Sequence, residues 1–124
     1  MEEKLKILAV DDNSISLAKI EQELKGEYEV TPVNSGERAL KFLKKNRPDL
    51  ILLDVQMALK NGVETLREIR KMENSKDIPV IMLTSQNDKQ TIVESSKLGI
   101  DGYVLKPFNA DDLRERIIRV LKKD

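Results

Sequence analysis

The sequence lacks several residue types on which common protein chemistry depends. It contains no cysteine, no histidine and no tryptophan, and its aromatic residues are two tyrosines and two phenylalanines. The lack of cysteine excludes disulfides and thiolate chemistry, and the lack of histidine removes the commonest general base and a common metal ligand. An excess of one charge is also lacking, because 22 basic residues balance 22 acidic ones. This balance argues against a protein that binds nucleic acid or membranes by electrostatic attraction.

Long hydrophobic runs are absent as well. No apolar segment approaches the roughly 18 residues that a membrane span needs, and Met1–Lys4 is too polar to begin a signal peptide. These absences allow a cytoplasmic protein, and we expect that location. The chain does contain 40% hydrophobic and 35% charged residues, a balance that is typical of globular domains. At 124 residues it is long enough to bury a core, so we expect one domain over residues 1–124.

The strongest local signal is an apolar run that ends in a carboxylate. Leu50–Leu53 is continuously apolar, is preceded by Pro48 and Asp49, and is followed at once by Asp54. A short apolar run between turn signals predicts a strand buried on both faces, as in a parallel sheet. Asp54 then lies at the carboxyl end of a central strand, which is where open α/β sheets build their sites.

Strand and helix patterns alternate five times along the chain. Strands are predicted at 5–10, 28–33, 50–53, 78–83 and 102–105. An apolar stripe at helical spacing follows each strand, and the fourth stripe, over about 88–98, is weak. In chain order the other four consist of Leu17, Ile20 and Leu24; Ala39, Leu40 and Leu43; Val63, Leu66 and Ile69; and Leu113, Ile117, Val120 and Leu121. Either Asp12 or Asn13 can cap the first helix. Pro32 suits only an edge strand. Five β-α units predict a doubly wound, five-stranded parallel sheet with helices on both faces, an α/β fold.

Polar side chains stand at the ends of four of these strands. They are Asp11 and Asp12 after the first strand, Asp54 after the third, Thr84 after the fourth and Lys106 after the fifth. Each alone has a simple structural explanation, such as a helix cap, a turn hydroxyl or a solvated lysine. Because the carboxyl ends of parallel strands meet at one edge of the sheet, we expect these five side chains to converge there.

Three carboxylates, one hydroxyl and one ammonium at one edge indicate phosphoryl chemistry. Clustered carboxylates repel one another unless a cation lies among them, and an oxygen-only ligand set favours Mg²⁺. Asp54 can attack phosphorus as a carboxylate nucleophile and form an aspartyl phosphate. Lys106 and the hydroxyl of Thr84 can then neutralise phosphoryl oxygens. This chemistry needs no general base, so the missing histidine is no objection.

Four motifs together carry a resemblance to a known family. They are Val10-Asp11-Asp12, then Asp54 with Met57 and Asn61-Gly62, then Leu83-Thr84-Ser85, and finally Gly99 through Tyr103 to Lys106-Pro107-Phe108. On these motifs the chain resembles a response-regulator receiver domain of two-component signalling, like the chemotaxis regulators, over essentially its whole length. The resemblance implies a flavodoxin-like sheet of strand order 2-1-3-4-5, which agrees with an edge position for Pro32. It also implies a cis peptide bond before Pro107.

The resemblance further implies a role for each residue at this edge. Asp54 would accept a phosphoryl group from a sensor histidine kinase or a histidine phosphotransfer protein. Mg²⁺ would be bound by Asp11, Asp12, Asp54 and the backbone carbonyl of Gln56. Lys106 and Thr84 would hold the phosphoryl group, and Tyr103 would be the switch aromatic that moves inward when Thr84 turns toward the phosphate.

Phosphorylation is expected to change the surface formed by the helix at about 88–98, the strand at 102–105 and the last helix. We expect a downstream protein to bind this surface, with no direct contact to nucleic acid or membrane. The chain would not be an enzyme for a separate substrate, and would catalyse only its own phosphorylation and dephosphorylation. The sequence ends at Lys123-Asp124 without an output domain, so we expect either a stand-alone regulator or a piece of a longer protein.

Three other functions are left as alternatives. A small Mg²⁺-dependent phosphatase would need an acid two residues after Asp54, where the chain has Gln56. A nucleotide or flavin module would need a glycine-rich turn after the first strand, where the chain has Asp11–Ser14. The strongest alternative is a receiver-like interaction module that is not phosphorylated, although such a module would normally have lost an acid or the lysine.

The chain also departs from the family's usual pattern. The family usually has proline at the position of Ala58, so the loop after the third strand lacks one fixed φ angle. Gln56 and Gln86 occupy the two variable positions that tune the hydrolysis of the aspartyl phosphate in this family. Ser85 stands where Ala or Gly is usual, and Ile100 stands where Ala is common. None of the departures, at Ala58, Ser85 and Ile100, removes a group that the predicted chemistry needs.

Overall fold

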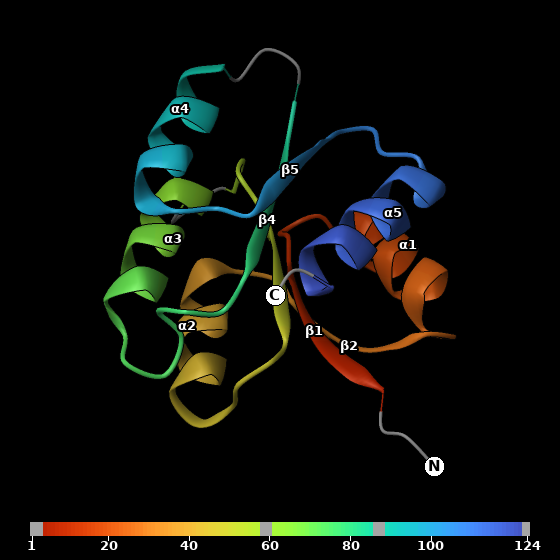
Figure 1. Ribbon diagram of the computed structural model, residues 1–124, viewed down its shortest axis with the longest axis horizontal. Helices are drawn as coiled ribbons and strands as arrows, with labels where there is room; N and C mark the ends of the chain where they lie inside the picture. The colour runs from red at the N-terminus through yellow and green to blue at the C-terminus, as the bar shows by residue number, and fades with distance from the viewer. Residues whose placement is uncertain (1–3, 58–60, 86–88, 123–124) are drawn as a thin grey trace.

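The computed structural model describes residues 4–57, 61–85 and 89–122, and Figure 1 shows how their strands and helices alternate. The strands are β1 (Leu5–Val10), β2 (Tyr28–Val33), β3 (Leu50–Asp54), β4 (Val80–Thr84) and β5 (Gly102–Leu105). The helices are α1 (Ser14–Leu24), α2 (Gly36–Lys45), α3 (Gly62–Lys71), α4 (Lys89–Leu98) and α5 (Ala110–Leu121). Each strand is followed by a helix, as the sequence predicts. Among the described residues, no helix has the length and apolar character that crossing a membrane requires.

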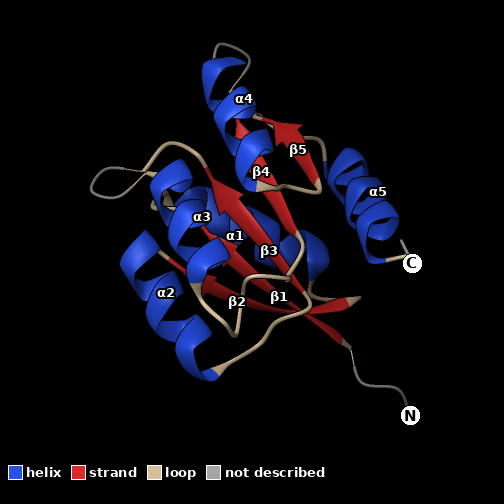
Figure 2. Cartoon of the chain, turned by 60° about the vertical axis from the view of Figure 1, so that its left-hand side comes forward, coloured by secondary structure: helices blue, strands red, loops and turns tan. Residues whose placement is uncertain are grey.

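The five strands form one parallel sheet in the order β2-β1-β3-β4-β5, which Figure 2 shows from the side of α2 and α3. Pro32 lies in β2 at one edge of this sheet, where its missing N–H costs no ladder hydrogen bond. Val10 of β1 lies beside Leu53 of β3, so Asp11 and Asp54 follow at the same edge. The predicted doubly wound fold and its strand order are confirmed.

Helices cover both faces of the sheet. Figure 1 shows α1 and α5 on one face and α2, α3 and α4 on the other. The strand β1 serves both cores, because Ile7 and Ala9 pack with α1 and α5 whereas Leu8 and Val10 pack with α2 and α3. All four of these side chains are at most 1% exposed, and full burial of a large aliphatic side chain contributes about 1.5–3 kcal/mol. Burial on both faces explains why the central strands are continuously apolar.

Short polar side chains begin four of the helices. The capping residues are Asn13, Ser35, Asn61 and Asn109. At α1 the cap is Asn13 and not Asp12, because Oδ1 of Asn13 accepts hydrogen bonds from the amides of Ile15 and Ser16 at 2.9 and 3.1 Å. The carboxylate of Asp12 lies instead with those of Asp11 and Asp54 at the edge of the sheet.

The third and fourth strands differ slightly from the sequence prediction, and each ends one residue later than predicted, at Asp54 and Thr84. The fourth strand, predicted at 78–83, begins only at Val80, because Pro79 has no N–H and contributes only a carbonyl, which accepts from Ile51 at 2.9 Å. The predicted start of the fourth helix, about Asp88, lies outside the described residues. That helix ends as predicted, since Gly99 follows it with a φ of 98°.

Candidate functional site

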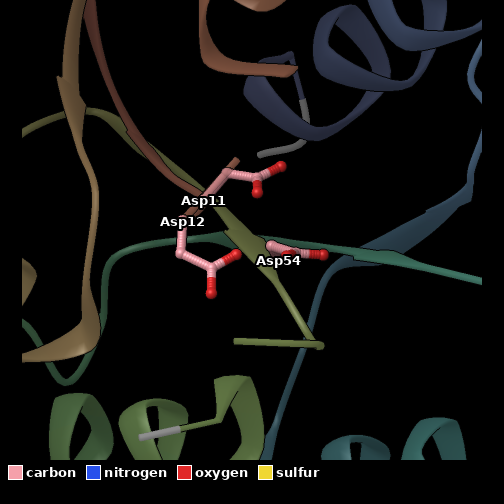
Figure 3. Close-up of side chains that lie close together, drawn as sticks. All are labelled: Asp11, Asp12 and Asp54. Carbon is pink, nitrogen blue, oxygen red and sulfur yellow. The ribbon is translucent and has the colours of Figure 1, made fainter. Parts of the chain in front are cut away.

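Three carboxylates from two neighbouring strands meet at the carboxyl edge of the sheet. Asp11 and Asp12 follow β1 and Asp54 ends β3, and Figure 3 shows the three side chains close together. One oxygen atom from each lies within 4.8 Å of the others. Asp11 is fully buried and Asp54 is 3% exposed, whereas Asp12 is exposed. The predicted convergence of the three acids is therefore present, with one open side.

Lys106 reaches this acidic cluster from the end of β5. Its Nζ lies 2.8 Å from Oδ2 of Asp11 and 3.3 Å from Oδ1 of Asp54. Its backbone amide donates to the carbonyl oxygen of Thr84 at 2.7 Å, which places β5 against the end of β4. The peptide bond between Lys106 and Pro107 is cis, as the resemblance implies. The ammonium of Lys106 therefore forms ion pairs with two buried carboxylates.

The buried charges shift one another's pKa values. The pKa of Asp54 is raised from 3.8 to about 6, because burial disfavours the carboxylate and the charge of Asp11 adds to this effect, while Lys106 opposes both. For Lys106, burial alone would lower the pKa, but the hydrogen bond to Asp11 and the charges of Asp54 and Asp11 outweigh burial and raise it. A single lysine therefore compensates the acids incompletely, and an added cation would lower the energy of the ionised cluster.

Thr84 and Tyr103 lie on the two strands at the β5 edge of the sheet. Thr84 ends β4 and is almost fully buried, and its hydroxyl donates to the carbonyl oxygen of Ser85 at 3.4 Å. Tyr103 lies on β5 beside Met82 of β4 and is 43% exposed. The aromatic ring therefore starts from the outward position that the predicted switch requires.

A cavity of about 560 Å³ opens beside the acidic cluster, between the end of β3 and helices α3 and α4. It is lined by Asp12 and Gln56 from the strand ends, by Asn61 and Arg67 at α3, and by Glu94 of α4. Gln56 is exposed and lies two residues beyond Asp54, at the rim of the cluster. The other two loop positions singled out from the sequence, Ala58 and Gln86, lie outside the described residues.

Sequence reasoning missed the close packing of Gly62 against the site. The amide of Gly62 donates to the carbonyl oxygen of Val55 at 2.8 Å. A β-carbon at this position would overlap the carbonyl oxygen of Asp54 and approach the α-carbon of Val55 to 2.7 Å. The Asn61-Gly62 pair predicts only a turn, and nothing in the sequence shows that the turn presses on the backbone of Asp54.

Comparisons with known proteins agree with this fold. A family model described as the response regulator receiver domain matches residues 7–118. The chemotaxis protein CheY-3 of Vibrio cholerae is 31% identical over 125 residues, which cover 99% of this chain and 96% of that protein. The probable transcriptional regulator ycf27 of Porphyridium aerugineum is 36% identical over 123 residues, which cover 98% of this chain. The chain spans about half the length of that regulator, 50%.

A solved structure shows the same likeness in three dimensions. The receiver domain of the sensor histidine kinase PA1611 from Pseudomonas aeruginosa is 30% identical and superimposes with a TM-score of 0.89, covering 98% of this chain and 100% of that one. That structure has a magnesium ion coordinated in its active site cleft. Because the family model spans most of the sequence and the relatives share its fold, the chain belongs to the response regulator receiver domains of two-component systems.

Proposed function

We propose that this receiver domain, over residues 1–124, accepts a phosphoryl group on Asp54 in a Mg²⁺-dependent reaction. The donor would be a sensor histidine kinase or a histidine phosphotransfer protein. The observation that carries the proposal is the position of Asp54, which is buried, 3.3 Å from the ammonium of Lys106 and within 4.8 Å of the two other acids. A structural ion pair would need one carboxylate for one lysine, whereas a nucleophile that receives a phosphoryl group needs this concentration of charged groups.

Three side chains of this protein would take part in the transfer. An oxygen of Asp54 would form the bond to phosphorus while the P–N bond to the donor's imidazole breaks, and the imidazole nitrogen keeps the electron pair and takes a proton from solvent. Lys106 would neutralise one phosphoryl oxygen, and the hydroxyl of Thr84 would turn away from Ser85 to donate to another. A pKa of about 6 leaves Asp54 mainly ionised at neutral pH, so it is available as the nucleophile.

The residues present fit a magnesium ion. The carboxylates of Asp11, Asp12 and Asp54 and the backbone carbonyl of Gln56 would hold it, and all of these are hard oxygen donors. Asp12 is exposed, which leaves room for the water molecules that Mg²⁺ retains. When bound, the ion would neutralise charge on the phosphoryl group. The magnesium ion in the cleft of the PA1611 receiver domain supports this assignment.

Phosphorylation would act on partner binding through Thr84 and Tyr103. The modification adds about −1.5 to −2 charges beside Thr84, and the movement of Thr84 would make room for the Tyr103 ring. In α4 the one buried residue is Ser95, so this helix is held weakly and is the element that shifts most easily. A downstream protein would bind the surface of α4, β5 and α5, without direct contact to nucleic acid.

The proposal is tested by phosphorylating the purified chain. Increasing Mg²⁺ at a fixed concentration of a small acyl phosphate should add one phosphoryl group, measured by intact mass, and peptide mapping should place it on Asp54. Asp54→Asn should abolish the modification at that position. Asp12→Asn should raise the Mg²⁺ concentration needed for half-maximal labelling. Glu29→Gln, which changes an exposed carboxylate on β2, is the matched control and should behave as the wild type.

Each alternative function has its own outcome in this experiment. Continued labelling of Asp54→Asn at the same position would refute Asp54 as the acceptor. A folded wild type that takes no phosphoryl group from any donor would instead indicate a receiver-like interaction module that is not phosphorylated. Sustained turnover of small phosphate esters would indicate a phosphatase.

The switch is tested with Thr84→Ala. This variant should still be phosphorylated on Asp54, because Thr84 is neither the nucleophile nor a metal ligand in the proposal. The change that phosphate causes in the NMR signals of Tyr103, and in affinity for a partner, should be lost. A Thr84→Ala variant that responds to phosphate as the wild type does would show that Tyr103 is not coupled to Thr84.

A further inference from the structure

The segment from Lys106 to Asn109 joins β5 to α5 and carries the ammonium that faces the acidic cluster. Several contacts hold its two ends. The amide of Lys106 donates to Thr84 at 2.7 Å, and the side chain of Asn109 accepts from the amides of Asp111 and Asp112 at the start of α5. The middle of the segment depends on Phe108, whose ring is 6% exposed in the core between the sheet, α1 and α5.

A lysine on α1 holds this middle residue from outside the core. Nζ of Lys19 donates to the carbonyl oxygen of Phe108 at 2.9 Å. The same ammonium lies 4.5 Å from the centre of the Phe108 ring, which is the geometry of a cation–π interaction. The two contacts restrain different parts of Phe108, because one holds its peptide plane and the other holds its ring.

We propose that Lys19 is a positioning residue for phosphoryl transfer, because it fixes the segment that aims Lys106 at Asp54 and Asp11. The inference rests on the proposed function of Asp54 and names a residue to which neither the motifs nor the chemistry of the site gave a role. Lys19 lies on the helix that directly follows Asp11 and Asp12, whereas Lys106 lies at the end of β5. The contact to Phe108 therefore ties the helix behind the two acids to the segment behind the ammonium.

Other contacts to the segment do not replace this one. Burial of the Phe108 ring keeps the ring in the core, but the carbonyl oxygen of Phe108 accepts its hydrogen bond from Lys19. The Lys106 side chain is 25% exposed, and solvent competes for its ammonium. A small rotation at Phe108 would be enough to lengthen the 3.3 Å contact between Lys106 and Asp54. Together, the hydrogen bond and the cation–π contact favour the conformation in which the segment is held over the one in which it is released by roughly five-fold.

The experiment compares three variants of the full chain. Lys19→Met keeps the aliphatic stem and removes the charge and the donor. Lys19→Arg keeps both. Lys41→Met removes an exposed lysine of α2 and serves as the control. The first measurement is the rate at which Lys106 is acetylated by acetic anhydride in the metal-free protein, relative to Lys44 and Lys45 in the same peptide map. The second is the initial rate of phosphorylation of Asp54 by acetyl phosphate at saturating Mg²⁺.

Lys19→Met should raise the relative acetylation of Lys106 roughly five-fold and lower the phosphorylation rate by a similar factor. Lys19→Arg and Lys41→Met should stay within about two-fold of the wild type, because both keep a donor and a cation over Phe108.

Three outcomes would overturn the inference. The first is wild-type behaviour of Lys19→Met in both measurements. The second is an equal rise in acetylation at Lys106, Lys44 and Lys45, which would show general loosening of the fold. The third is faster acetylation of Lys106 with an unchanged phosphorylation rate, which would leave Lys19 a structural residue only. A wild type that takes no phosphate would refute the function of Asp54, and the acetylation measurement would still decide whether Lys19 positions Lys106.

Discussion

Gly62 packs directly against the backbone of Asp54, and the space between them is too small for a β-carbon. The amide of Gly62 donates to Val55 at 2.8 Å, so the first turn of α3 rests on the end of β3. Glycine is needed here for its size, because its φ is not in the left-handed region. The contact holds the backbone that carries the proposed nucleophile.

Gly62→Ala should lower the free energy of unfolding by about 1–3 kcal/mol, because α3 must move away from β3 to admit the methyl group. The same movement should weaken Mg²⁺ binding by displacing Asp54. Urea denaturation and a Mg²⁺ titration measure the two effects. Gly26→Ala is the matched control, since no atom lies within 4 Å of the position that its methyl group would take, and it should be neutral or slightly stabilising. Equal stability of the two variants would contradict the packing at Gly62.

Replacing Asp54 should stabilise the metal-free protein, in a manner that depends on pH. The pKa of Asp54 is about 6 in the folded protein and 3.8 as a free group, so between these values the folded state binds more protons than the unfolded state. The free energy of unfolding therefore falls as the pH rises through this range. At pH 8, Asp54→Asn should be more stable than the wild type by about 1–3 kcal/mol.

This gain should shrink below pH 6 and vanish near pH 4, because the wild-type carboxyl is then protonated too. Urea denaturation in EDTA at several pH values provides the measurement, and Glu29→Gln again serves as the control. A gain of the same size at pH 4 and pH 8 would mean that the charge of Asp54 is not its cause.

Two buried serines should respond to alanine with opposite signs. Ser75 donates its hydroxyl to the carbonyl oxygen of Ile69 at 2.8 Å, whereas the buried hydroxyl of Ser95 in α4 has no hydrogen-bond partner among the described residues. Ser75→Ala should cost about 1 kcal/mol. Ser95→Ala should stabilise by about 1 kcal/mol, because it removes an unpaired hydroxyl and adds a better helix former. Thermal or urea denaturation measures the stability of both variants, and destabilisation by Ser95→Ala would contradict the prediction.

Arg70 should hold the end of α4 against α3. Its Nε and Nη2 both donate to the carbonyl oxygen of Gly99, at 3.0 and 2.8 Å. Its Nη1 donates to the backbone carbonyl oxygens of Lys76 and Ile78. Arg70→Lys should cost about 1–3 kcal/mol, because one ammonium cannot reproduce a planar fork with several donors. Hydrogen exchange should show the largest loss of protection around Gly99. Arg38→Lys, at an exposed position of α2, should have little effect; a similar loss in both variants would show that Arg70 has no special role.

Much of the fold could be predicted because its signals are local. Alternating apolar runs and helical stripes predicted all five strand and helix pairs, and Pro32 predicted the edge strand. The start of β4 was misplaced at Ile78, because that residue is buried and apolar like a strand residue but precedes Pro79, which cannot donate to the ladder. The family's strand order came from resemblance, since no local signal determines which strands are neighbours.

The order of amino acids is enough to show which chemical groups end the strands, and therefore that Asp11, Asp54 and Lys106 share one edge of a parallel sheet. Three other features become visible only in the folded chain: Lys106 lies nearer to Asp11 than to Asp54, Gly62 has no room for a side chain, and Lys19 contacts Phe108. Composition and periodicity are properties of neighbouring residues, whereas these contacts join segments that are distant in the chain and depend on how two helices pack on a twisted sheet.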